Sequence, residues 1–328
     1  MIAYTFPSKS AGDSFHDKLL AEIAAEDGRK RRKKSWPDRS AEALAKFLAD
    51  PSKEIPSLWS EIKPVFTRLQ HGKCAFCERP LGADEVSAYE QDMEHFRPKK
   101  GLTPWPPKQP LGSLPHPSDI PTSLHSGQGY RHLPFHELNY IVACKTCNSR
   151  CKANYFPIAG TKHDFTSKDP VPLLTKEKPY LVYPLGGLDD DPESIITFIG
   201  YRADVPKSAK GHKRDRARVI IHFFLLNDPT RSDQLFFGRA TQLDLLRGKI
   251  LDFEKSPAAQ RQSAWDQVIL ECSSVNPFAG CVRSMVRLYR SDPDAAHALL
   301  KEASEYRRSM LGAANIKEIS STPPLRRR

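Results

Sequence analysis

The sequence lacks any long apolar run. No stretch of about eighteen consecutive apolar residues occurs, so no transmembrane helix is predicted. Residues 1–15 lack the apolar stretch of a secretory signal peptide, and no internal repeat is present. A phosphate-binding loop of the form Gly-x-x-x-x-Gly-Lys is also missing, so any ATPase activity must reside in a separate protein. We therefore expect a cytoplasmic protein without membrane contact.

The charge is unevenly distributed. The 328 residues carry a formal net charge of +11, and residues 205–328 hold 22 Lys and Arg against 13 Asp and Glu. Excess Lys and Arg favour a polyanionic partner, because they release counterions from phosphates. The alternative is a solvated basic surface that binds nothing. The basic run at 29–34 is equally open, because it either contacts nucleic acid or is a mobile connector.

The pattern of apolar residues predicts an α+β fold that is predominantly helical, with three parts. Residues 1–70 form an N-terminal helical and basic segment, residues 71–165 contain the motifs, and residues 166–328 form a mostly helical basic domain. Within the middle part, residues 98–134 are rich in Pro and Gly and predict a long surface insertion. Helices are expected at 14–27, 40–49, 57–70, from about 211, and at 231–254, 258–273, 278–290 and 293–310, and strands at 180–183 and 195–198.

Two Cys-x-x-Cys pairs predict a zinc site. Cys74 with Cys77, and Cys144 with Cys147, each present two thiolates from one tight turn, and zinc prefers four such ligands in a tetrahedron. Residues 78–143 separate the pairs, so another element must be inserted between them. The alternative is four buried free cysteines. Cys151 is expected to be an ordinary thiol rather than a fifth ligand.

An acid–histidine pair lies in that inserted element. Glu94 and His95 are adjacent, and Asn148 directly follows the last cysteine of the second pair. Hydrolysis of a phosphodiester needs a base that activates water and a cation that offsets the charge developing on phosphate. Neighbouring side chains on a strand point to opposite faces, so both groups can serve one phosphate only with a local bend.

These segments resemble the HNH endonuclease family, in particular its branch with four zinc-binding cysteines. The resemblance implies a small ββα-metal core, with His95 as the general base and with Glu94 and Asn148 as ligands of one catalytic magnesium or manganese ion. It implies that Asn139 braces the loop between strand and helix. Glu94 and Asn148 stand where Asp and His are commoner, and their hard oxygen donors favour magnesium or manganese. From charge alone, Arg97, Lys99 and Lys152 are expected to contact phosphate.

A narrower resemblance rests on the residues in and around these motifs, namely residues 72–78, residues 94–99, Cys147 with Asn148, and Phe156 with Pro157. They are similar to HNH proteins of bacterial anti-phage systems, such as the Septu nuclease subunit and retron effectors. That similarity covers roughly residues 70–250 and implies DNA as the substrate and a separate ATPase subunit as a partner. Two alternatives stay open: a non-catalytic zinc module that binds nucleic acid or a partner, and an RNase.

Overall fold

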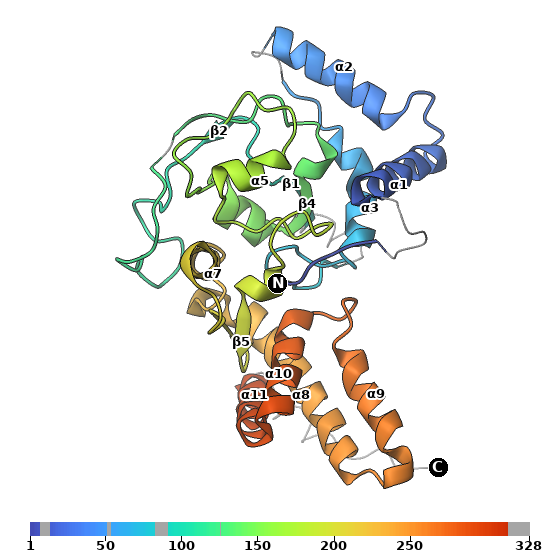
Figure 1. Cartoon of the computed structure of the whole chain (residues 1–328), viewed down its shortest axis with the longest axis vertical. Helices are drawn as coiled ribbons and strands as arrows, with labels where there is room; N and C mark the ends of the chain where they lie inside the picture. Colours follow the sequence, from blue (N-terminus) through green and yellow to red (C-terminus); the bar gives the residue numbers. More distant parts are fainter. Residues whose placement is uncertain (7–13, 51–53, 83–90, 125, 314–328) are drawn as a thin grey trace.

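The computed structural model describes residues 1–6, 14–50, 54–82, 91–124 and 126–313 (Figure 1). Within these ranges helices predominate, and the strands form three separate antiparallel pairs. The prediction of an α+β, mostly helical chain is confirmed. None of the helices in these ranges combines the length and apolarity needed to cross a membrane.

Three helices form the N-terminal part: α1 (Phe15–Arg29), α2 (Trp36–Ala49) and α3 (Trp59–Leu69). Helix α1 begins where the Ser14 hydroxyl accepts from the Asp17 amide and the Asp17 carboxylate accepts from the Ser14 amide. At α2 the Ser35 hydroxyl accepts from the Asp38 amide, so this helix begins four residues before the predicted range. Pro64 lies inside α3 and does not mark its start.

The basic run at 29–34 joins α1 to α2. Four of its six cations form ion pairs with carboxylates on the neighbouring helices: Arg29 and Lys30 with Glu26, Arg32 with Glu61, and Lys34 with Glu42. The run thus connects α1 to α2 and forms partly exposed ion pairs with α1, α2 and α3, and its contact with nucleic acid stays a prediction.

The middle part is built around one strand pair. Strand β1 (Gln91–His95) pairs with β4 (Tyr140–Cys144), and α3 packs against both strands. All five residues of β4 are buried, as expected for a strand with both faces covered. The π-helical segment η2 (Thr146–Lys152) follows β4 directly. The unit therefore runs strand, strand, helical turn, with the insertion between its strands.

The segment 98–134, predicted as a long surface insertion, has many exposed residues but packs against the rest of the chain through a few buried ones. It contains the short pair β2 (Gly101–Leu102) and β3 (Gly127–Gln128), and the 3-10 turn η1 (Glu137–Asn139) follows it. Trp105 and Tyr130 are fully buried, and the Trp105 ring centre lies 5.5 Å from that of Phe223. The backbone amide of Leu114 donates to Asp228 at 3.1 Å. Burial of these aromatic groups holds the segment against the C-terminal part.

The remaining elements are mostly helical, and α7 to α11 follow the predicted ranges closely, whereas α5, α6 and β6 were not predicted. Figure 1 shows α8, α9, α10 and α11 gathered at one end of the molecule. The elements are α5 (Pro172–Glu177), α6 (Pro192–Ile195), β5 (Thr197–Ile199), β6 (Arg202–Asp204), α7 (Gly211–Phe223), η3 (Pro229–Arg231), α8 (Ser232–Lys255), η4 (Ala258–Gln260), α9 (Arg261–Glu271), α10 (Ala279–Ser291) and α11 (Pro293–Ala313).

The two strands predicted in this part need correction. Residues 180–183 are buried but form no strand ladder, and Tyr180 and Leu181 lie in a bend. The backbone amide of Tyr180 bonds to the Pro157 carbonyl, and that of Tyr183 bonds to the Asp189 carboxylate. The second strand, β5, begins at Thr197, since Ile195 ends α6.

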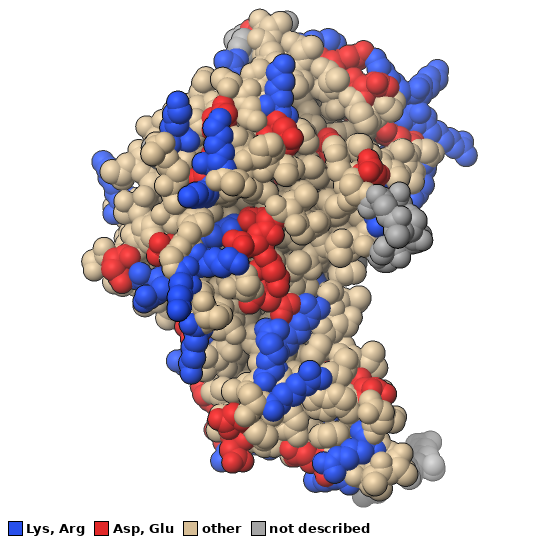
Figure 2. All heavy atoms as spheres, viewed as in Figure 1, with Lys and Arg blue, Asp and Glu red and all other residues tan. Residues whose placement is uncertain are grey.

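One hydrophobic cluster contains residues from all three predicted parts, such as Leu19, Ile141 and Leu243. On the face shown in Figure 2, Lys and Arg recur from the upper part to the lower helices, with Asp and Glu between them. Positive charge on this face is therefore interspersed with negative charge, rather than collected into a single basic surface.

Candidate metal centre and the adjoining acid–histidine site

The four predicted cysteines come together. Cys74 and Cys77 lie in the turn that follows α3, Cys144 ends β4, and Cys147 lies in η2. All four are buried, and their sulfur atoms lie within 4.8 Å of one another, with 3.9 Å between those of Cys77 and Cys144. Zinc–sulfur bonds of about 2.3 Å in a tetrahedron place sulfurs about 3.8 Å apart. The donor set and its spacing thus fit a zinc ion.

The surroundings of the cluster favour thiolates. The Cys147 amide donates to the Cys144 sulfur at 3.5 Å, and the guanidinium of the buried Arg231 donates to the Cys147 sulfur at 3.5 Å. Burial opposes the charge on Arg231, but the neighbouring cysteine thiolates raise the pKa of its guanidinium above the ordinary value. Arg231 therefore brings a permanent positive charge to a site that four thiolates would make negative.

The acid–histidine pair sits on β1, with its two side chains in different surroundings. Side chains alternate along a strand, so Asp92 and Glu94 lie on the same face of β1, the face that η2 covers. There the Asn148 amide nitrogen donates to Asp92 at 2.8 Å, and the Lys152 ammonium lies 2.9 Å from the Glu94 carboxylate. Burial raises the pKa of Glu94, and the ammonium of Lys152 works against that rise. This face therefore collects oxygen donors beside the cysteine cluster.

His95 lies among aromatic rings. Its ring centre is 4.7 Å from that of Trp59 and 5.1 Å from that of Tyr140, both edge-on. Its Nε2 lies 3.0 Å from the carbonyl oxygen of Pro134. Because a carbonyl only accepts, Nε2 carries the hydrogen and Nδ1 keeps its lone pair. Burial, together with the positive charge of Lys99, holds the pKa of His95 well below its ordinary value. The ring is therefore neutral near pH 7 and able to accept a proton at Nδ1.

Lys99 lies close to His95 and Trp59. Its ammonium lies 3.4 Å from Nδ1 of His95 and 3.9 Å from the centre of the Trp59 ring. Burial lowers the pKa of Lys99 to about 8, while the charge of Glu94 raises it. Of the three cations predicted to contact phosphate, Lys99 is the one with a partly exposed side chain.

The other two cations do not fit that prediction. Arg97 is 1 % exposed, and its guanidinium pairs with the buried carboxylate of Glu177 at 3.0 Å. Lys152 is fully buried against Glu94. A sequence shows their charge but not their burial, and neither side chain faces solvent.

Asn139 is fully buried and joins two backbone segments. Its side-chain oxygen accepts from the Arg97 amide at 2.8 Å, and its nitrogen donates to the carbonyls of Arg97 and Leu133. Asn139 thus fastens the chain after β1 to the chain before β4, whereas the resemblance implied that it braces the loop between strand and helix.

Several neighbours of the pair were missed by sequence reasoning. Asp92 could have been found, because it stands two residues before Glu94 on a strand. Trp59 and Lys63, like Arg231 beside the cysteine cluster, come from distant segments and carry no local signal. Within the described chain, a hollow of about 440 Å³ is lined by Trp59, Ser60, Lys63, Pro64, Gln91, Asp92, Met93 and Asn148, whereas neither Glu94 nor His95 is among its lining residues.

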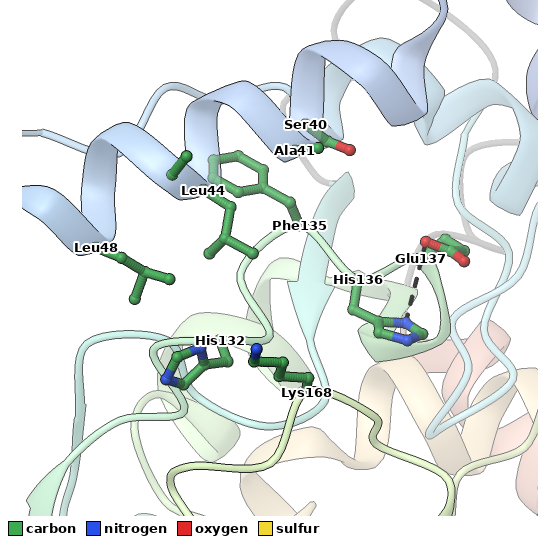
Figure 3. Close-up of a pocket in the computed structure, with 10 residues that line it drawn as sticks. Ser40, Ala41, Leu44, Leu48, His132, Phe135, His136, Glu137 and Lys168 are labelled. Atoms are coloured by element: carbon green, nitrogen blue, oxygen red, sulfur yellow. Dashed lines mark ion pairs between the residues drawn. The ribbon is translucent and has the colours of Figure 1, made fainter.

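A second hollow of about 370 Å³ lies between α2 and residues 132–137 (Figure 3). Leu44 and Leu48 of α2 face Phe135, His132 and Lys168 across it. It contains neither member of the acid–histidine pair, but its loop carries the Pro134 carbonyl that orients His95.

Comparison with known proteins gives one relative. The chain is similar to the Septu protein PtuB of Bacillus mycoides (strain KBAB4), with 29% identity over 137 residues. The alignment spans 42% of this chain and 38% of that protein, so well under two thirds of the relative is covered. No protein-family model matches the chain, and no solved structure matches it significantly.

Proposed function

We propose that this chain is a metal-dependent endonuclease of the HNH type that hydrolyses DNA as part of an anti-phage defence system. One observation carries the proposal. The β1–β4–η2 unit carries the adjacent Glu94 and His95 on β1 and Asn148 on η2, the segment that also holds Cys147 of the cysteine cluster. A protein that only binds nucleic acid has no need of a buried, neutral, oriented histidine that directly follows a buried carboxylate in the chain.

In this proposal His95 is the general base and accepts a proton from water at Nδ1. The Pro134 carbonyl holds the tautomer that leaves this nitrogen unprotonated. Lys99, whose ammonium lies near Nδ1, is placed to contact the phosphate that the water attacks. Removal of a general base typically costs about 10²–10⁴-fold in rate.

The oxygen donors fit a hard divalent cation such as magnesium or manganese. Glu94 and Asn148 would hold it, with Asp92 beside them, since the Asn148 nitrogen donates to Asp92 and leaves the amide oxygen to act as a ligand. Such a cation offsets the charge that develops on the phosphate. The four cysteines would hold a separate, structural zinc ion.

The defence role rests on the similarity to the Septu protein, which also supports a partner subunit. A separate ATPase is the partner we propose. The basic helical part, residues 166–328, would bind DNA or this partner.

The test is cleavage of supercoiled plasmid DNA and of a single-stranded RNA by the zinc-loaded protein, with and without added magnesium or manganese. We expect nicked or linear DNA only with the added cation. Cleavage of RNA alone would favour an RNase. If neither is cut, by the protein alone or together with the proposed ATPase partner, a non-catalytic zinc module is favoured.

A further inference from the structure

Lys152 is a buried lysine that faces the candidate cation site. It ends η2, four residues after Asn148, and its side chain is fully buried. Its ammonium lies 2.9 Å from an oxygen of Glu94. Beyond this ion pair, no hydrogen-bond partner for the ammonium is found among the described residues. The nearest ring is that of Phe156, with its centre 5.9 Å away.

A buried ammonium without other acceptors is costly, and Glu94 offsets that cost. Conversely, Lys152 is the ion-pair partner of Glu94 in the described part of the chain. The two groups satisfy each other, so the carboxylate is already occupied by a positive charge.

We propose that Lys152 competes with the divalent cation for Glu94 and keeps the affinity of the site for that cation low. This rests on the proposed function, in which Glu94 is a ligand of the cation. A cation that binds Glu94 must displace the ammonium or lie a few ångströms from it. Repulsion at that distance is strong in a partly buried site, and the displaced ammonium has no second acceptor among the described residues.

Removal of Lys152 distinguishes competition with the cation from a role of Lys152 in binding phosphate. A residue that competes with the cation weakens binding, so its removal raises the affinity for the cation. A residue that only contacts phosphate leaves the affinity for the cation unchanged in the absence of substrate.

The experiment measures binding of manganese to the zinc-loaded protein by the loss of the free-ion electron paramagnetic resonance signal, without nucleic acid. Lys152→Met and Lys152→Gln remove the charge, and Lys152→Arg keeps it. Lys145→Met is the matched control, because Lys145 pairs with Asp92 at 3.2 Å but is exposed. Zinc content and thermal unfolding identify any variant that has failed to fold, and the two neutral variants provide independent readings.

We expect both neutral variants to bind manganese at least about tenfold more tightly than wild type, which corresponds to about 1.4 kcal/mol. Lys152→Arg and Lys145→Met should bind like wild type, and adding Glu94→Gln to Lys152→Met should remove the gain. If manganese binding depends on Glu94 but is unchanged or weaker in the neutral variants than in wild type, the proposed competition is wrong. The proposed function would then still stand. If no variant shows manganese binding that depends on Glu94, both the competition and the proposed function are overturned.

Discussion

Replacement of one cysteine of the cluster should have a large effect on the folded state. Cys144→Ser removes a ligand at the point where β4 ends and η2 begins. The cluster connects two turns that are separated by residues 78–143, and Asn148 directly follows one of its members. Loss of zinc therefore releases both the turn after α3 and the segment that carries Asn148.

The magnitude follows from the number of ligands. Structural zinc contributes about 10–16 kcal/mol in small zinc-binding peptides, or about 3–4 kcal/mol for each of four ligands. For a chain of this size, each kcal/mol lowers the melting temperature by about 2–4 °C. We expect Cys144→Ser to lower it by about 6–16 °C and to reduce bound zinc from one ion per chain to well below half.

The assay combines elemental analysis of the purified protein with calorimetric unfolding, with and without a chelator. Cys272→Ser is the matched control, because Cys272 is partly exposed after α9 and lies outside the cluster. A Cys144→Ser protein that keeps a full zinc ion and melts with the wild type would refute the four-cysteine site. So would a wild-type protein that binds less than about half an ion per chain.

Two further predictions concern buried carboxylates away from the metal. Glu177→Ala leaves the guanidinium of Arg97 buried without its partner and removes the acceptor of the Tyr130 hydroxyl at 2.8 Å. It should cost about 3–5 kcal/mol in the free energy of unfolding, measured with denaturant, whereas a cost below about 1 kcal/mol would contradict the importance of this pair. Asp228 accepts from the Leu114 amide and from Thr230, and these hydrogen bonds, acting against burial, lower its pKa to about 2 from 3.8. Its stabilisation, at most about 2 kcal/mol, is present above about pH 4 and lost as the pH falls toward 2. Asp228→Asn should flatten the unfolding free energy over that range, and an unchanged slope would count against the assignment.

The cysteine cluster could be predicted because the pattern that indicates it lies within a few consecutive residues. A Cys-x-x-Cys turn presents two thiolates whatever the rest of the chain does, so two such turns indicate one site. The amphipathic helices of the C-terminal part were predictable for the same reason, since their spacing and their proline boundaries are local.

Long-range packing explains what was missed. Tyr180 and Tyr183 have the composition of a strand, but their backbone amides are taken by the Pro157 carbonyl and the Asp189 carboxylate, which a strand pattern does not show. Trp105 looks like part of a surface loop until Phe223 covers it. Such contacts between distant segments leave no local pattern in the sequence.

Contacts between distant segments also explain the outcome for the positively charged side chains of the site. Arg97 and Lys152 carry charges that suggest phosphate contact, but each finds a buried carboxylate from another segment. Lys99 has a partly exposed side chain near His95, so its contact with phosphate stays a prediction. Charge was thus readable from the sequence, whereas exposure was not.

The most direct test of the central claim is plasmid cleavage by His95→Ala compared with wild type, each zinc-loaded and supplied with magnesium or manganese. His297→Ala is the control, because His297 pairs with Glu254 among the C-terminal helices. We predict cation-dependent cleavage by wild type and by the control, and a loss of at least about 10²-fold with His95→Ala at unchanged zinc content. Equal cleavage by His95→Ala and wild type would contradict the assignment of His95 as the base.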